Sequence, residues 1–252
     1  MNLHQVDLTK DQLDRIPVAE RRLFILVAHA ANELNALAKL FHFAASSASE
    51  HGLIGQAENA QALVLARVLT GKIYEFWKLL QISFFGAQLS KEYEGLMDAE
   101  AADSLNELKR YFGRDNLISM VRNEFAFHYS PEQIDSGYRA LVDGDPLQLY
   151  LAKRNVNTLY AFADTIAGRA MLEAIQPGEH KAAFAALIAQ TSSAVGQINT
   201  VIGGLMIVCF QKHIGSSFYD LQPQLVEVDG VPESQKVAIP FFVEIPDETD
   251  DA

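Results

Sequence analysis

The sequence has little cysteine, no excess of positive charge and no long apolar run, and each shortage excludes a class of protein. The single cysteine, Cys209, excludes an intrachain disulfide framework and a zinc site built from cysteines. A formal net charge of −12 excludes a surface that coats nucleic acid in general, because such a surface is basic. A small local site for a few nucleotides stays compatible with this charge.

No segment has the make-up of a membrane span or a secretory leader. The most apolar run, Val201–Phe210, is too short to cross a bilayer and is bordered by polar residues. The first residues, MNLHQVDLTKDQ, lack a basic region followed by an apolar one. We therefore expect a cytoplasmic protein that does not enter a membrane. A phosphate-cradling glycine loop and a G-x-S-x-G motif are also absent.

Helical periodicity dominates what is present, because apolar residues recur at three- and four-residue steps over long stretches. The periodicity predicts four helical regions, Val18–Ser49, Ile54–Phe85, Asn155–Ile175 and Glu179–His213. Helix N-caps are predicted at Thr9, Asp98, Asp115 and Ser130. Pro131 directly after Ser130 strengthens the last of these, since proline suits the first position of a helix.

Short β segments are expected at two places. An Asp-Gly turn between Tyr138–Val142 and Leu147–Leu151 predicts a β-hairpin over about 138–151. After Gly215 prolines recur, and strand-like pieces lie at Leu225–Val228 and Val237–Ile245, before an acidic tail. The predicted fold is all-α: a helical bundle with a small β-hairpin insertion, over residues 1–214. A short β-containing C-terminal extension, residues 215–252, follows it.

The polar chemistry concentrates at Val121–Pro131, which we call the motif segment. It reads VRNEFAFHYSP, and the capping signal that follows ends its helix by Tyr129 or Ser130. At about 100° per residue, Glu124 and His128 share one edge of the helix, whereas Arg122 lies about 120° around the axis from His128. The two residues meet only if the helix unwinds near its end or if two chains contribute to one site.

Five residues separate Arg122 from His128, and Asn123 directly follows the arginine. This arrangement resembles the R-x(4–6)-H motif of HEPN domains. The resemblance covers about residues 18–175. It implies a helical bundle that forms a homodimer, with the Arg and His of both protomers lining a cleft that cuts RNA without a metal ion or a cofactor. Some HEPN members occur in toxin–antitoxin or phage-defence systems, so an antitoxin or regulatory protein is an implied partner. Other members lack activity.

The residue types suit RNA cleavage. Such cleavage needs a base for the ribose 2′-OH, an acid for the leaving 5′-oxygen and cationic donors around the phosphorane. His128 exchanges protons near neutral pH, and Arg122 offers a planar fork to phosphate oxygens. Asn123 would hold a phosphate or orient the histidine. Glu124 would orient His128, and Tyr129 would stack on a base or donate to phosphate.

Plainer interpretations stand beside this one. Arg122 would form an ion pair with Glu124 or another acidic neighbour, and the motif would be structural in a non-catalytic helical module that binds protein or nucleotide. Residues 105–139 carry five basic and five acidic side chains, so no basic groove is evident from the sequence. His29 and Glu33, four residues apart, have the spacing of metal ligands. Since no second such pair is evident that would complete a ligand set with this one, a polar strip on their helix is the favoured interpretation.

Overall fold

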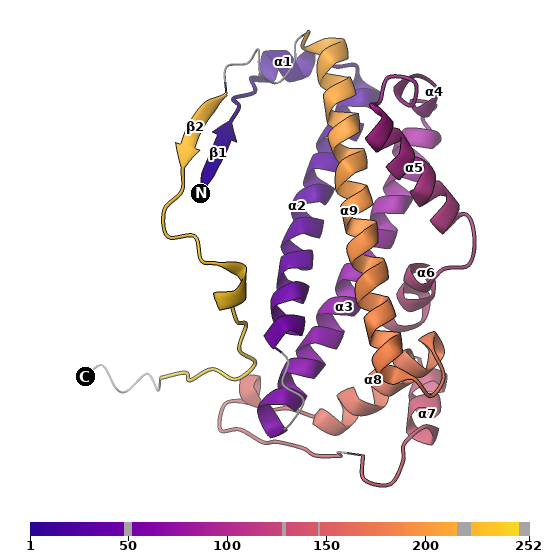
Figure 1. Cartoon of the computed structure of the whole chain (residues 1–252), viewed down its shortest axis with the longest axis vertical. Helices are drawn as coiled ribbons and strands as arrows, with labels where there is room; N and C mark the ends of the chain where they lie inside the picture. The colour runs from indigo at the N-terminus through magenta and orange to yellow at the C-terminus, as the bar shows by residue number, and fades with distance from the viewer. Residues whose placement is uncertain (48–51, 128–129, 146, 216–222, 247–252) are drawn as a thin grey trace.

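In a computed structural model, the protein is a helical bundle built on three long helices (Figure 1). They are α2 (Val18–Ser47), α3 (Gly52–Leu80) and α9 (His180–His213). The structure describes residues 1–47, 52–127, 130–145, 147–215 and 223–246. Helix α9, with 34 residues, is about 51 Å long at 1.5 Å per residue, and this length sets the long dimension of the bundle.

Shorter helices cover one side and both ends of the long ones (Figure 1). They are α1 (Lys10–Asp14), α4 (Ser90–Tyr93), α5 (Ala99–Phe112), α6 (Leu117–Val121), α7 (Pro131–Arg139) and α8 (Ala161–Ile175). Two π-helical segments, η1 (Gln81–Phe85) and η2 (Arg122–Ala126), continue α3 and α6. Single 3₁₀ turns lie at Asn155–Asn157 and Ser234–Lys236. The prediction of a predominantly helical bundle is confirmed.

Three of the four predicted caps are confirmed. The Thr9 side chain accepts from the Gln12 N–H in a full capping box, Asp98 caps α5, and Ser130 caps α7 with proline after it. The prediction at Asp115 is wrong by one residue. Asn116 begins α6, because its side-chain oxygen accepts from the Ser119 N–H at 2.8 Å.

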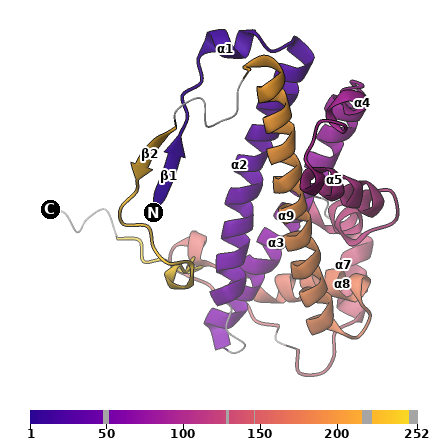
Figure 2. The ribbon, with the colours of Figure 1, turned by 45° about the horizontal axis from the view of Figure 1, so that its top comes forward.

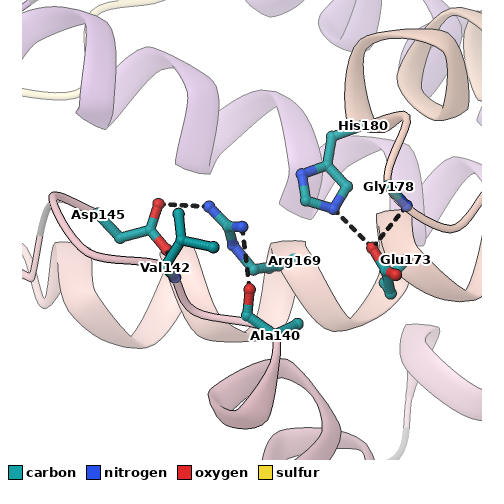
Figure 3. Close-up of polar contacts among 7 residues, drawn as sticks. All are labelled: Ala140, Val142, Asp145, Arg169, Glu173, Gly178 and His180. Carbon is teal, nitrogen blue, oxygen red and sulfur yellow. Dashed lines mark hydrogen bonds and ion pairs between the residues drawn. The ribbon is translucent and has the colours of Figure 1, made fainter.

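The predicted β-hairpin over 138–151 is wrong. Its first strand would include Tyr138 and Arg139, which end helix α7, and Tyr150 instead forms an isolated bridge with Leu159. The Asp-Gly sequence belongs to a loop that Arg169 of α8 holds (Figure 3). The Arg169 guanidinium donates to the Ala140 carbonyl at 3.1 Å and pairs with Asp145. Asp145 also accepts from the backbone N–H of Val142 at 2.7 Å, so its carboxylate closes the turn over residues 142–145.

The turn between α8 and α9 is closed by Glu173 (Figure 3). Its carboxylate accepts from the Gly178 N–H at 3.1 Å and contacts His180 Nε2 at 2.8 Å. These two contacts, the backbone N–H foremost, hold the pKa of Glu173 below its ordinary value. Gly178 has a φ of +74°, which glycine adopts without strain, so the chain turns between the predicted helical regions that end at Ile175 and begin at Glu179.

The β structure comes from the two ends of the chain. Strand β1 (Asn2–Gln5) pairs antiparallel with β2 (Gln224–Glu227), with Asn2 opposite Glu227. Both strands lie on the other side of the bundle from α5 (Figure 1 and Figure 2). The strand predicted at Leu225–Val228 is therefore confirmed to within a residue. Val237–Ile245 forms no strand, and Phe241 and Phe242 within it pack against a small buried cluster that includes Ala57 and Leu159.

Small residues allow the helices to approach closely. A Cβ on Gly204 of α9 would lie 2.5 Å from the Cβ of Ala101 on α5, and one on Gly137 of α7 would lie 2.2 Å from the Ile166 carbonyl oxygen on α8. Aromatic packing completes the core, since the rings of Trp77 and Phe112 stack at 5.0 Å.

A buried polar cluster joins the start of α2 to the end of α9. The Glu20 carboxylate accepts from the Tyr93 hydroxyl and contacts Lys212 Nζ at 2.9 Å and His213 Nε2 at 2.8 Å. Burial alone would raise the pKa of Glu20, but the hydrogen bonds from Tyr93, His213 and Lys212 outweigh it and lower this pKa. The charges also suit the helix ends, with a carboxylate at an N-terminus and cations at a C-terminus.

Contrary to the expectation from the sequence, α2 and α9 are, within the described ranges, long and apolar enough to cross a membrane by length and composition. The core helix of a water-soluble bundle passes the same test. The apolar stretch of α9 is 56% buried inside the structure, as expected of a core helix, whereas that of α2 is 22% buried.

We predict that Glu20→Gln lowers the free energy of unfolding by about 2–3 kcal/mol near neutral pH, since it leaves Lys212 and His213 without their shared buried carboxylate. Because the folded-state pKa of Glu20 is lowered, its contribution is present above the ordinary glutamate pKa and is lost as pH falls through the folded value. The unfolding free energies of the two proteins, measured by urea denaturation, should therefore converge as pH falls from the ordinary glutamate pKa of 4.5 through the lower folded value.

Glu92→Gln is the matched control, because Glu92 also pairs with Lys212, at 2.8 Å, but its side chain is 62% exposed. We expect it to cost less than about 1 kcal/mol. Equal costs for the two variants, or a Glu20 effect that does not change with acidification, would contradict this assignment.

Candidate functional site

The motif segment departs from α-helical geometry at Arg122. Helix α6 ends at Val121, and Arg122–Ala126 form the π-helical segment η2, in which backbone hydrogen bonds run from residue i to i+5. Such widened turns are rare and occur often at functional sites. The helix therefore changes its winding within the predicted motif. His128 and Tyr129, the other two predicted site residues on this segment, lie outside the described residues.

Arg122 rests on α3. Its guanidinium donates to Glu75 at 3.0 Å and to the side chain of Asn123 at 3.2 Å, and it lies over the Tyr74 ring at 4.9 Å. The acidic neighbour is thus Glu75 rather than Glu124. The Arg122 side chain stays 30% exposed, while its Nε is shielded and has no hydrogen-bond partner among the described residues.

Glycine on α3 brings the motif segment close. A Cβ on Gly71 would lie 2.2 Å from Cε2 of the Phe127 ring, so the ring occupies the space that a side chain would fill. Gly71 and Glu75 are four residues apart and share one face of α3. The same face therefore supports both ends of η2, with Phe125 buried between them and Asn123 and Phe127 exposed.

Glu124 connects the motif segment to α7. Its Oε2 accepts from Gln133 Nε2 at 2.9 Å, and Gln133 lies in the first turn of α7, where its backbone N–H donates to the Ser130 cap. The predicted contact from Glu124 to His128 lies outside the described residues. Within the described part, the carboxylate holds η2 against the next helix.

A cavity of about 630 Å³ opens beside η2, between α3, α7 and α8. Small and apolar side chains form most of its wall, and Arg67, Glu124, Gln133 and Asp164 supply its long polar ones. Burial raises the pKa of the Asp164 carboxyl above its ordinary value, although the positive charge of Arg67 acts in the opposite direction. The cavity falls within the size range of small-molecule sites.

The alternative metal pair forms part of a polar strip. His29 Nε2 lies 3.9 Å from Glu33, whose carboxylate is bound by Lys72 of α3 at 2.8 Å. Across the described ranges, no group of three or more His, Cys, Asp or Glu side chains is arranged to hold a metal ion.

No protein-family model, curated protein or solved structure matches this chain.

Sequence reasoning missed the residues that surround the motif. Tyr74 and Glu75 lie on a core helix beside the buried aromatics Phe76 and Trp77, and nothing in their spacing marks them as partners of Arg122. Asp164 also lies in an apolar stretch of α8, where a single carboxylate was the available signal.

We predict that Glu75→Gln lowers the free energy of unfolding by less than about 1 kcal/mol, because the side chain of Glu75 is 50% exposed. Arg122→Gln should cost more, since it also removes the stacking on Tyr74, which adds about 0.5–1 kcal/mol. Urea denaturation of both variants and of the double variant gives the coupling energy. A coupling above about 2 kcal/mol would mean that the ion pair locks the fold, and it would contradict the prediction.

Proposed function

We propose that the protein is a metal-independent endoribonuclease of the HEPN type, which acts as a homodimer. The carrying observation is the Arg122 side chain, which Tyr74 and Glu75 hold in place and which is 30% exposed, on a π-helical turn beside a cavity of about 630 Å³. An arginine restrained in this way loses little conformational freedom when it binds a phosphate.

The proposed reaction is attack of the ribose 2′-oxygen on the adjacent phosphorus. A P–O2′ bond forms while the P–O5′ bond breaks, which leaves a 2′,3′-cyclic phosphate and a free 5′-hydroxyl. His128 would take the proton of the 2′-hydroxyl, and the second His128 of the dimer would give a proton to the leaving 5′-oxygen. Arg122 would stabilise the added negative charge of the phosphorane, and Asn123 would bind a phosphate oxygen. Tyr129 would stack on a base.

A dimer is part of the proposal because the HEPN resemblance implies that the Arg and His of both protomers line one cleft. The motif segment has an open side, where Asn123 and Phe127 are exposed, so a second copy could reach it. A two-fold axis through this surface would bring the same element of each chain together. An antitoxin or regulatory protein would be a further partner of this acidic protein, which we propose to be cytoplasmic.

A second candidate function is a non-catalytic helical module that binds protein or nucleotide. The ion pair between Arg122 and Glu75 favours it, because a guanidinium already bound by a carboxylate has a structural role. In this case Arg122→Ala would lower the melting temperature and no RNA would be cut.

We predict that the wild-type protein cuts single-stranded RNA in the presence of EDTA, and that Arg122→Ala and His128→Ala each lower the rate at least about 100-fold. Gel analysis of a labelled oligonucleotide measures the rates, and the cyclic phosphate end identifies the reaction. Arg110→Ala is the matched control, since Arg110 also pairs with a glutamate, Glu107 at 3.3 Å, but lies outside the motif. Equal activity in all four proteins, or none in any, would contradict the proposal.

Sedimentation of the full chain tests the dimer separately. The composite site requires a dimer at the concentration at which RNA is cut. A monomer that retains full activity would contradict the shared site. The roles of Arg122 and His128 would then be decided by the activities of Arg122→Ala and His128→Ala alone.

A further inference from the structure

Much of the wall of the cavity beside η2 is apolar. Ala163, Ala167 and Ala170 of α8 and Val64 and Val68 of α3 contribute to it. Alanine side chains leave a smooth surface, and Phe127 adds an aromatic ring that is 52% exposed. Walls of this kind fit a planar ring system, because apolar faces and an aromatic edge are the contacts that a stacked base makes.

Opposite charges meet at one side of the cavity. Asp164 is a partly buried carboxylate, and the guanidinium of Arg67 is close enough to act on its ionisation. A ligand edge that satisfies both groups must present hydrogen-bond donors beside acceptors. Arg67 and Asp164 therefore bring a multiple donor and a two-oxygen acceptor to the same cavity wall, and these are the groups that can read the edge of a ligand.

The cavity and Arg122 lie along one face of α3. Arg67 lines the cavity, Gly71 lies under Phe127, and Tyr74 lies under the Arg122 guanidinium. These positions follow each other at steps of four and three residues, so they share a face. Seven residues at 1.5 Å each separate the two sites by about 10 Å along the helix, roughly the length of one nucleotide from base edge to phosphate.

We propose that this cavity binds a guanine base, and that it thereby selects the nucleotide on the 5′ side of the cut. Among the four RNA bases, guanine alone presents two neighbouring N–H donors, N1–H and N2–H, on its pairing edge. These donors match the two oxygens of Asp164, and the adjacent O6 accepts from Arg67. The role of the bound guanine in selecting the cut rests on the proposed function, but the test of guanine binding does not require RNA cleavage.

The test measures the binding of guanosine 3′-monophosphate to the full chain in EDTA by titration calorimetry. The adenosine, cytidine and uridine 3′-monophosphates are measured in the same way for comparison. We expect the guanosine nucleotide to bind about tenfold more tightly than the others. Asp164→Asn should remove this preference, since an amide offers one acceptor where a carboxylate offers two. Asp103→Asn is the matched control, on the exposed face of α5.

A second variant separates this cavity from its neighbour. Asp164 also borders a cavity of about 270 Å³ lined by Gln56 and Asn59, whereas Ala163 lines the larger cavity and not this one. Ala163 is exposed, so Ala163→Phe should fill the larger cavity without disturbing the core. We expect it to weaken guanosine nucleotide binding at least about tenfold. Ala185→Phe, at an exposed position of α9, should leave binding unchanged.

Equal binding of all four nucleotides, absence of binding, or a guanosine preference that survives Ala163→Phe would each overturn the inference. The proposed function fails in a different way. RNA cleavage without a guanosine preference would contradict only the inference about the cavity. Guanosine binding in the cavity without RNA cleavage would contradict only the proposed endoribonuclease function.

Discussion

The packing of the motif segment against α3 is the constraint on which the candidate site depends. Helix α3 contacts α2, α6, η2, α8 and α9, and small buried residues on it, Ala66, Thr70 and Gly71, make this many close approaches feasible. The Thr70 hydroxyl donates to the Ala66 carbonyl at 2.7 Å, so the helix buries a polar group without leaving it unsatisfied. A larger side chain at Gly71 would meet the Phe127 ring. Through this one helix, the core of the bundle and the motif segment are positioned together.

The π-helical segment follows from the same packing. Arg122 reaches Tyr74 and Glu75, while Phe127, five residues later, lies over Gly71, and the intervening Phe125 is buried. The step of five positions from Arg122 to Phe127 matches the i to i+5 hydrogen bonds of η2. The widened turn presents Asn123 to solvent and turns Glu124 toward Gln133. The proposed chemistry depends on this arrangement, because it restrains Arg122 while leaving part of its guanidinium exposed.

Local signals predicted much of the fold, and long-range contacts account for what they missed. The caps at Thr9, Asp98 and Ser130 act within one turn of helix, so the sequence alone identifies them. The Asp-Gly turn is also a local signal, but Arg169, 24 residues from Asp145, draws it into a loop. The sequence motif identifies Arg122, Asn123 and Glu124 as candidate site residues. It does not identify Glu75, which lies 47 residues from Arg122 in the chain. Residues of three helices line the cavity, and no spacing in the sequence predicts that they come together.

The most direct measurement is a crystal structure of the protein with the dinucleotide GpU methylated at the guanosine 2′-oxygen, which blocks the proposed attack. The account predicts the guanine in the cavity between α3, α7 and α8, with its pairing edge on Asp164 and Arg67. The phosphate should lie within hydrogen-bond distance of the Arg122 guanidinium, at an interface between two copies of the chain. A dinucleotide bound elsewhere, with Arg122 still paired to Glu75 and no phosphate beside it, would contradict the account.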